Sequence, residues 1–570
     1  MMNLDLSHLK LKPFYLSDAD VSWVDETIGK MTDEEKVAQL FCLIAYSSDE
    51  DYLTKLAKND KVGGVMCRPM SYEETIKTNS ILQANSDIPM LIAANLERGG
   101  VGIIEEGTSL GSMMAVGATD NDEMASNLGT VCGKEGYAVG CNWSFAPVID
   151  IDYNWRNPIT NVRTFGSNPE RVKRMGVNYV EALQKEGVAA SIKHFPGDGV
   201  DERDQHLVTS INSMDVKTWD ETFGEVYRAS IDAGAMSIMI GHISMPEYSR
   251  KLKPGIKDED ILPATLADEI TTTLLKEQLG FNGLVVTDAT TMAGMTIPMH
   301  RSKSVPLSIA AGCDMFLFAK DMDEDFEYMR KGIEDGIITQ ERLHDALSKI
   351  LGMKAALKLH EKQKDGTLMP EVNLEDMLKS HEAWAKECAD CAITLVKEEA
   401  GVMPITPDRY KRILIYPHEA SEGFAYTVRV GAANSLAEKL KEEGFIVEIF
   451  EPKPGFEGMM QSVASIEDHY DLLLHVANFA TKSNQTTVRI EWAIPMGTNV
   501  PIYMESIPTV FVSLENPYHL IDVPRVKTFI NTYASNEVTL DALVCKLTGN
   551  SEFKGKNPID PFLGMWDTRL

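Results

Sequence analysis

Short, almost continuously apolar segments alternate with amphipathic segments through the N-terminal part of the chain. The amphipathic segments include residues 168–187 and 218–234, and Thr32-Asp33-Glu34-Glu35 has the pattern of a capping box at the start of the first helix. Strands buried on both faces of a parallel sheet have this near-continuous apolar character. The apolar segments number eight and cover residues 41–46, 62–67, 89–97, 142–152, 188–195, 235–243, 283–290 and 313–320. Eight strands with helices between them predict a parallel (β/α)8 barrel over roughly residues 30–360.

A polar stretch at residues 360–384, rich in charge and containing both Gly and Pro, interrupts this alternation. The pattern then resumes on a smaller scale, with apolar segments at 393–399, 412–418, 445–451, 472–479 and 509–516 and helical segments at 434–444 and 537–550. These predict a second, smaller α/β domain, an open sheet with helices on both faces. The predicted fold class is therefore α/β. We place the barrel domain with its N-terminal arm at residues 1–375 and the C-terminal α/β sandwich domain at residues 376–570.

Composition narrows the class of protein. The chain has 570 residues, 44% of them hydrophobic and 25% charged, and a formal net charge of −30, as in acidic soluble globular proteins. A charge this negative disfavours nucleic-acid binding, and no apolar run reaches the roughly 18 residues of a membrane span. The first residues lack a secretory pattern, so we expect a cytoplasmic protein. No metal or organic cofactor and no nucleic-acid or membrane partner is expected, and the oligomeric state stays open.

The eight cysteines are expected to be reduced and mostly buried. Cys388 and Cys391 form a C-x-x-C pair, but a zinc site needs a second pair that the sequence lacks. We therefore interpret them as two small residues one turn apart on a helix.

In a barrel of this kind the catalytic groups lie where the strands end. Asp288 directly follows a buried strand, and its alternative role is to cap the next turn. Asp204 and His206 form a D-x-H pair, in which a carboxylate could hold an imidazole in one tautomer; an exposed acidic loop is the alternative. Further polar residues at the predicted strand ends are Asn95, Glu97, Asp150, Asp152, Arg156, Arg163, Lys193, His194, Asp198 and His242.

Lys193 and His194 are neighbours on a strand, so both side chains enter the opening only if the strand bends there. Pro196 and Gly197 favour such a bend, and one core histidine with one solvated lysine is the alternative. Arg163 could clamp a polar ligand or pair with a nearby acid. His242 is explained more simply as a core residue.

Four blocks of sequence resemble the β-N-acetylglucosaminidase branch of glycoside hydrolase family 3. They are ANLERGG (94–100), FAPVIDIDYNWRNPITNVRTFGSNPE (145–170), SIKHFPGDGVDERDQH (191–206) and GFNGLVVTDATTMAGM (280–295). Their order and spacing match that branch, and the resemblance extends into the second domain through SLENPYHLIDVP and the closing LTGNSEFKGKNPIDPF.

The resemblance implies a role for each matching residue. Asp288 would be the nucleophile that forms a covalent glycosyl-enzyme, and His206, paired with Asp204, would be the general acid/base. Two displacements at one carbon would retain the anomeric configuration. The residues that would bind the sugar are Lys193, His194, Arg163, Asn95 and Glu97.

Five features depart from the branch's pattern. One is the absence of the Arg that usually follows the E-G-G segment in the cell-wall-recycling members, where this chain reads VGIIEEGT. Asn95 stands where the family has a substrate-binding Asp, Arg98 interrupts the usual E-G-G, Asp198 replaces a His of many members, and Gln205 replaces a Ser or Thr. These changes leave the chemical step intact and bear on the substrate.

The leading prediction is a retaining, exo-acting β-N-acetylhexosaminidase that acts on a small carbohydrate with a terminal β-linked N-acetylglucosamine, such as a cell-wall fragment. The alternatives are a phosphate-dependent β-N-acetylglucosaminide phosphorylase, a β-glucosidase-type member, and a non-catalytic sugar-binding protein on the same fold.

Overall fold

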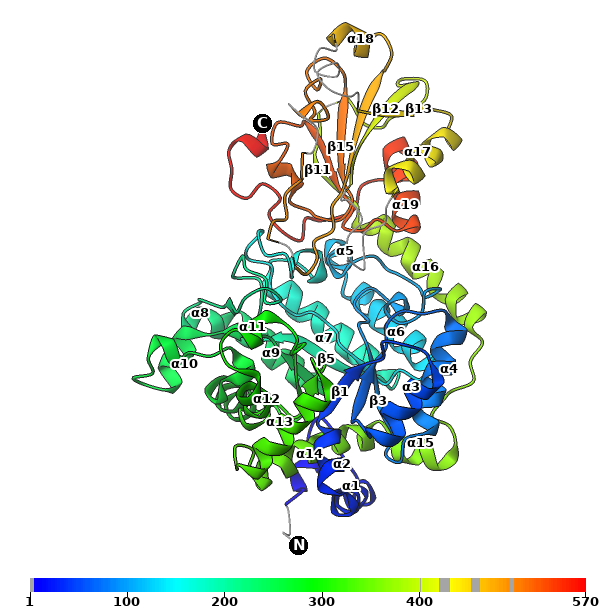
Figure 1. Cartoon of the computed structure of the whole chain (residues 1–570). Helices are drawn as coiled ribbons and strands as arrows, with labels where there is room; N and C mark the ends of the chain where they lie inside the picture. Colours follow the sequence, from blue (N-terminus) through cyan, green and yellow to red (C-terminus); the bar gives the residue numbers. More distant parts are fainter. Residues whose placement is uncertain (1–4, 400, 420–430, 453–461, 485, 493–496) are drawn as a thin grey trace. The chain divides into compact units, whose positions relative to one another are not determined.

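The computed structural model describes residues 5–399, 401–419, 431–452, 462–484, 486–492 and 497–570 (Figure 1). These residues form two compact units. The first, here called the barrel unit, contains Met1–Thr108, Ala125–Asn154 and Val172–His381. The second, here called the sheet unit, contains Ser109–Met124, Trp155–Arg171 and Glu382–Leu570.

The barrel unit is built on an eight-stranded parallel sheet in the order β10-β1-β2-β3-β4-β5-β7-β9. Its strands are β1 (Phe41–Ile44), β2 (Gly64–Met66), β3 (Leu91–Ala94), β4 (Trp143–Ser144), β5 (Ala189–Phe195), β7 (Ser237–Ile240), β9 (Leu284–Thr287) and β10 (Phe316–Leu317). A parallel bridge between Val286 of β9 and Met315, just before β10, joins the two edges of the sheet into a nearly closed barrel. Each predicted apolar segment contains one of these strands, so the predicted (β/α)8 fold is confirmed.

Helices lie outside these strands (Figure 1). Those with all or most of their residues in the barrel unit are α1 (Asp18–Lys30), α2 (Asp33–Gln39), α3 (Glu50–Thr54), α4 (Tyr72–Ala84), α6 (Asp122–Ala138), α7 (Pro169–Lys185), α8 (Val216–Glu221), α9 (Phe223–Asp232), α10 (Pro246–Leu252), α11 (Ala293–Thr296), α12 (Arg301–Ala310), α13 (Met322–Glu334), α14 (Gln340–Ala356) and α15 (Leu359–Asp365). A π-helical segment, Glu269–Gln278, precedes β9, and a two-stranded pair, β6 (Ser210–Ile211) with β8 (Ile243–Ser244), flanks the barrel sheet.

Two helix predictions need correction. The capping box at Thr32 is present but begins α2, because α1 comes before it with its own box between Ser17 and Asp20. The amphipathic segment 218–234 is two helices, α8 and α9, because Thr222 leaves the helical region at φ −121 and ψ −91.

The sheet unit contains a six-stranded sheet in the order β11-β16-β15-β14-β12-β13. All neighbours are parallel except β11 and β16. Its strands are β11 (Thr394–Lys397), β12 (Arg412–Glu419), β13 (Ile446–Ile449), β14 (Leu472–Asn478), β15 (Thr509–Ser513) and β16 (Thr528–Asn531), and its shorter helices are α5 (Met113–Thr119), α17 (Ala432–Glu442), α18 (Val463–Glu467) and α19 (Glu537–Thr548). The predicted α/β sheet domain is confirmed, and β16 is a strand that the sequence did not reveal.

Helix α16 (Leu374–Ala392) contains residues of both units. Cys388 and Cys391 lie one turn apart on it, as expected. All eight cysteines are free thiols, and six of them are buried. Among the described helices, none has both the length and the apolar character needed to cross a membrane.

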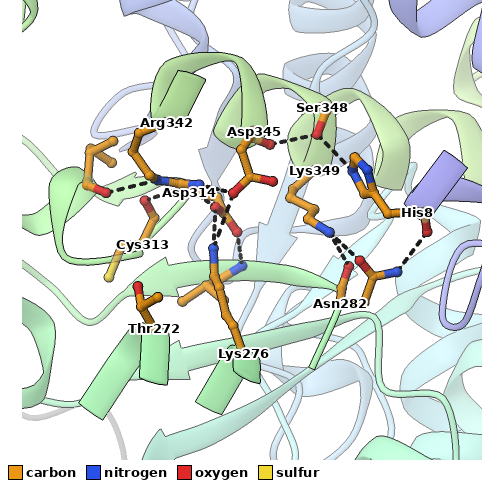
Figure 2. A network of polar contacts seen from close by, with 12 residues as sticks. His8, Thr272, Lys276, Asn282, Cys313, Asp314, Arg342, Asp345, Ser348 and Lys349 are labelled. Atoms are coloured by element: carbon orange, nitrogen blue, oxygen red, sulfur yellow. Dashed lines mark hydrogen bonds and ion pairs between the residues drawn. The ribbon is translucent and has the colours of Figure 1, made fainter. Parts of the chain in front are cut away.

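A network of charged side chains lies at the N-terminal ends of β9 and β10, opposite the strand ends considered below (Figure 2). Asp314 is fully buried there and accepts hydrogen bonds from Lys276 Nζ (2.9 Å), from Arg342 and from the backbone N–H of Val285 (2.8 Å). The Asn282 side-chain amide donates to the carbonyl oxygens of His8 (2.8 Å) and Lys12 (2.9 Å). The N-terminal arm is therefore attached to the start of β9. This is the face of the barrel whose residues contribute to stability rather than to catalysis.

Lys354 of α14 is a second cation in the core of the barrel unit. Its side chain is fully buried and donates to Oε1 of Gln39 at 2.7 Å. Burial lowers the pKa of its amine to about 7. Between about pH 7 and about pH 10.5, the unfolded chain therefore binds a proton at this lysine that the folded protein does not bind. The free energy of unfolding rises with pH across this range. Below about pH 7 the protein bears the full destabilisation that comes from burying the amine.

Replacing Lys354 by Met is expected to stabilise the protein, by about 1–3 kcal/mol at about pH 6, because an apolar side chain of similar length removes the cost of burying the amine. The gain is expected to shrink toward about pH 9, where the unfolded chain itself begins to lose the proton. Calorimetric unfolding at the two pH values checks this, with the exposed Lys386→Met as control. An equal loss of stability at both pH values would contradict the expected neutral, unfavourably buried amine.

Candidate active site

Asp288 stands directly after β9, at the C-terminal edge of the barrel sheet. Its backbone N–H donates to the carbonyl of Ile240, the last residue of β7 (2.8 Å). One carboxylate oxygen, Oδ1, accepts the backbone N–H of Ala289 (2.7 Å). The side chain is partly exposed. The backbone of two strands thus fixes a carboxylate that a ligand in the barrel opening could reach.

Three imidazoles surround this carboxylate. Burial alone would raise the pKa of Asp288, but the positive potential of His194, His242 and His206, together with the N–H of Ala289, holds the pKa below its usual value of 3.8. Asp288 is therefore ionised throughout the neutral and mildly acidic range. An ionised carboxylate can act as a nucleophile or stabilise a developing positive charge.

Asp204 and His206 form a hydrogen-bonded pair in the loop that follows β5. The Asp204 side chain is buried, and its Oδ1 accepts both the backbone N–H and ring Nδ1 of His206, each at 2.8 Å. The His206 side chain is 29% exposed. Because the carboxylate engages Nδ1, the other ring nitrogen, Nε2, is the one that can give or take a proton at a substrate.

The loop that carries His206 is docked on the segment that follows the Asp288 strand. The backbone N–H groups of Ala293 and Gly294 donate to the carbonyls of His206 and Gln205, both at 3.0 Å, and the Thr209 hydroxyl donates to the carbonyl of Gly294 at 2.9 Å. A Cβ on Gly294 would come within 2.6 Å of the Gln205 carbonyl oxygen, so only glycine permits this approach. The imidazole and the carboxylate are thus held together by main-chain bonds.

Lys193 and His194 both reach the strand-end region, because β5 has an irregular register between Ile192 and Phe195. The Lys193 side chain is buried, with Nζ 2.7 Å from an oxygen of Glu97 and 3.3 Å from Oδ1 of Asn95. This arrangement differs from the alternative of a solvated lysine. The structure therefore joins three of the predicted sugar-binding residues in one cluster.

His194 pairs with a buried carboxylate from the loop after β4. Its Nδ1 lies 2.7 Å from Oδ2 of Asp150, whose Oδ1 also accepts the backbone N–H of His194 (3.0 Å). His242 differs, because its nitrogens bond Thr265 Oγ1 (2.8 Å) and the Ala289 carbonyl (3.0 Å), and burial lowers its pKa. The core interpretation of His242 fits these contacts, whereas His194 is the imidazole with the largest lowering effect on the pKa of Asp288.

Arg163 belongs to the sheet unit, in a short 3-10 turn at Asn161–Arg163. Its backbone N–H donates to the carbonyl of Thr160 (2.7 Å), and its guanidinium donates to the carbonyl of Ile159 (3.3 Å). Its predicted contact with a sugar stays a prediction.

The candidate metal ligands lie elsewhere. In the part of the chain that the structure describes, the one group of three potential ligands is Asp20, His360 and Glu361, and Lys358 already contacts both Asp20 oxygens at 2.8 Å. This group shares no residue with the strand-end cluster.

Comparison with known proteins identifies the family of the chain. Residues 32–353 match the glycosyl hydrolase family 3 N terminal domain. The chain belongs to glycosyl hydrolase family 3. It is thus a glycoside hydrolase family enzyme, and the predicted family and enzyme class are confirmed.

Relatives with similar sequence or structure carry names from this family. The chain is 52% identical over 565 residues to a beta-N-acetylglucosaminidase/beta-glucosidase of Cellulomonas fimi, covering 99% of this chain and 100% of that protein. It is 29% identical over 407 residues to beta-hexosaminidase A of Pseudoalteromonas piscicida, covering 66% of each. The solved structure of beta-glucoside phosphorylase BglX matches 99% of this chain and 100% of its own, at 42% identity and a TM-score of 0.92.

Proposed function

We propose that this family 3 enzyme is a retaining, exo-acting β-N-acetylhexosaminidase that releases terminal β-linked N-acetylglucosamine. The observation that carries the proposal is the pairing of an ionised carboxylate at the end of β9 with an Asp204–His206 pair on a loop bonded to the same segment. The similarity to the Cellulomonas fimi protein supports this substrate, and its name also supports β-glucosides.

The proposed reaction has two displacements at the anomeric carbon. In the first, Asp288 attacks that carbon while His206 Nε2–H gives its proton to the departing oxygen, so the glycosidic bond breaks and a glycosyl ester forms. In the second, His206 takes a proton from water, whose oxygen displaces Asp288. Asp204 stabilises the His206 imidazolium that is present before the first displacement and after the second, and it fixes the tautomer of the neutral ring between them.

The sugar-binding residues proposed from the sequence fit a neutral ligand. The Lys193–Glu97 ion pair and the hydrogen-bonded His194–Asp150 pair hold polar groups at the strand ends. Sugar hydroxyls both donate and accept, so such paired groups suit them. Asn95 contributes an amide to the same cluster, and Arg163 is proposed as a further donor.

A second candidate is transfer to phosphate in place of water. The solved β-glucoside phosphorylase, 42% identical over nearly the whole chain, is the observation that favours it. An imidazole acid/base is uncharged once it has given its proton, whereas the second carboxylate of most glycosidases would repel a phosphate dianion. The product would then be a sugar 1-phosphate.

Release of nitrophenol from the β-N-acetylglucosaminide and from the β-glucoside, with and without phosphate, tests the proposal. Hydrolysis predicts turnover of the N-acetylglucosaminide at a rate that phosphate leaves unchanged, with free sugar as product. A rate that rises with phosphate, with sugar 1-phosphate formed, would replace hydrolysis by the second candidate. No turnover of either glycoside, together with tight binding of N-acetylglucosamine, would favour a sugar-binding protein.

A further inference from the structure

The Gln205 side chain connects the acid/base loop to the ends of two barrel strands. Gln205 lies between the paired residues Asp204 and His206 in the sequence, and its side chain is fully buried. Its Nε2 donates to Oδ2 of Asp198 (3.2 Å), and its Oε1 accepts the backbone N–H of His242 (2.8 Å). Its backbone carbonyl accepts the N–H of Gly294. One residue thus ties the loop to its own beginning, to the end of β7 and to the segment after Asp288.

Asp198 continues these bonds toward the sugar-binding residues. Its Oδ1 accepts the backbone N–H of Gly199 (2.7 Å), and its own backbone N–H donates to Oδ1 of Asp150 (2.8 Å). Asp150 in turn holds His194 through both the backbone and the ring. A chain of hydrogen bonds therefore runs from His194 through Asp150 and Asp198 to Gln205.

We infer that Gln205 is a positioning residue that holds His206 in place for proton transfer, with Asp198 as its partner. The inference rests on the proposed function, in which His206 is the acid/base. The positions 198 and 205 both depart from the pattern that the sequence resembles, and in the structure they bond each other.

The chemistry of the amide explains why this residue suits the position. Asp198 presents a carboxylate oxygen and so requires a donor, whereas the His242 N–H requires an acceptor. A carboxamide supplies one of each without adding charge next to the buried Asp204 and Asp198. A carboxylate at position 205 would instead face Asp198 across about 3 Å, and one of the two would have to hold a proton.

Four variants test the inference, with Glu202→Gln, an exposed acid in the same loop, as the matched control. Gln205→Ala removes both side-chain bonds. Gln205→Glu is expected to be active only at low pH, where the carboxyl pair shares a proton, and to lose activity as the pH rises. Asp198→Asn leaves one carbonyl oxygen to accept from two donors, the Gly199 N–H and Gln205 Nε2. The double variant Asp198→Asn/Gln205→Glu exchanges donor and acceptor, keeps the bond between the two side chains and the acceptor for the His242 N–H, and is expected to restore the wild-type pH profile.

The deciding readout is how kcat/KM, which reports the first displacement, depends on the leaving group. A dinitrophenolate leaves without a proton, whereas a sugar or alkyl alcohol needs one. Gln205→Ala is expected to lose about tenfold to a hundredfold in kcat/KM on an alkyl glycoside and less than about threefold in kcat/KM on the dinitrophenyl glycoside, because His206 is misplaced and Asp288 is not. An equal loss on both substrates, or failure of the double variant to restore the wild-type pH profile that Gln205→Glu loses, would overturn the inference.

His206→Asn separates this inference from the proposed function. If His206 is the acid, this variant shows the same selective loss, by about a hundredfold or more on the alkyl glycoside. Absence of that selectivity would reject the acid/base assignment itself. Selectivity in His206→Asn without selectivity in Gln205→Ala would reject the positioning role alone. Melting temperatures of all variants identify any that lose activity by unfolding.

Discussion

Asp288→Asn is expected to lower kcat by at least about a thousandfold on every β-glycoside that the enzyme cleaves. An amide oxygen cannot form the glycosyl ester, so the covalent route closes whatever the leaving group. The fold is expected to persist, because the amide oxygen of Asn can still accept the Ala289 N–H that the carboxylate accepts now. Single-turnover release of nitrophenol, with the melting temperature, measures both effects.

The matched control is Asp232→Asn, which makes the same chemical change at an exposed carboxylate on α9. It is expected to leave kcat within about twofold of the wild type. Near-normal turnover in folded Asp288→Asn would show that the carboxylate after β9 is not the nucleophile.

Asp204→Asn is expected to lower kcat by about a hundredfold to ten-thousandfold on substrates with poor leaving groups. Both bonds from His206 go to one oxygen, Oδ1, and the carbonyl oxygen of Asn can accept both. The substitution therefore keeps these two bonds and removes the negative charge that stabilises the imidazolium. Steady-state kinetics on alkyl and dinitrophenyl glycosides measures the loss.

Glu202→Gln is again the control, because it removes a charge from the same loop at an exposed position. It is expected to change kcat by less than about twofold. A loss in Asp204→Asn no larger than in this control would mean that the buried carboxylate orients His206 without contributing electrostatically.

The barrel strands were predictable because a parallel barrel buries both faces of each strand, which leaves apolar runs in the sequence. The strand β16 was missed because its sequence lacks such an apolar run. Its four residues, Thr528–Asn531, contain only two apolar side chains, so their pairing with β15 leaves little local pattern. The break between α8 and α9 depends on the backbone at Thr222, which hydrophobic periodicity does not record.

The candidate site divides in a similar way. The rule that catalytic groups follow barrel strands singled out Asp288, His206 and Lys193 by position alone. Their partners depend on where side chains meet in space, as in Lys193 with Glu97. The proposed role of Gln205 could not be predicted, because nothing in the sequence pairs it with Asp198. The grouping of residues 155–171, with Arg163, in the sheet unit also follows from contacts rather than from chain order.

In the proposed reaction, the sugar is carried on Asp288 between the two displacements. Incubation with 5-fluoro-β-N-acetylglucosaminyl fluoride tests it most directly, because the fluorine at C5 slows both displacements through the oxocarbenium-like transition state while fluoride leaves readily. We expect the intact mass to rise by one fluorosugar per chain and the added mass to map to the peptide containing Asp288. The label is expected to be absent from Asp288→Asn. A sugar attached to any other residue, or turnover of the reagent with no covalent adduct, would show that Asp288 is not the residue that carries the sugar.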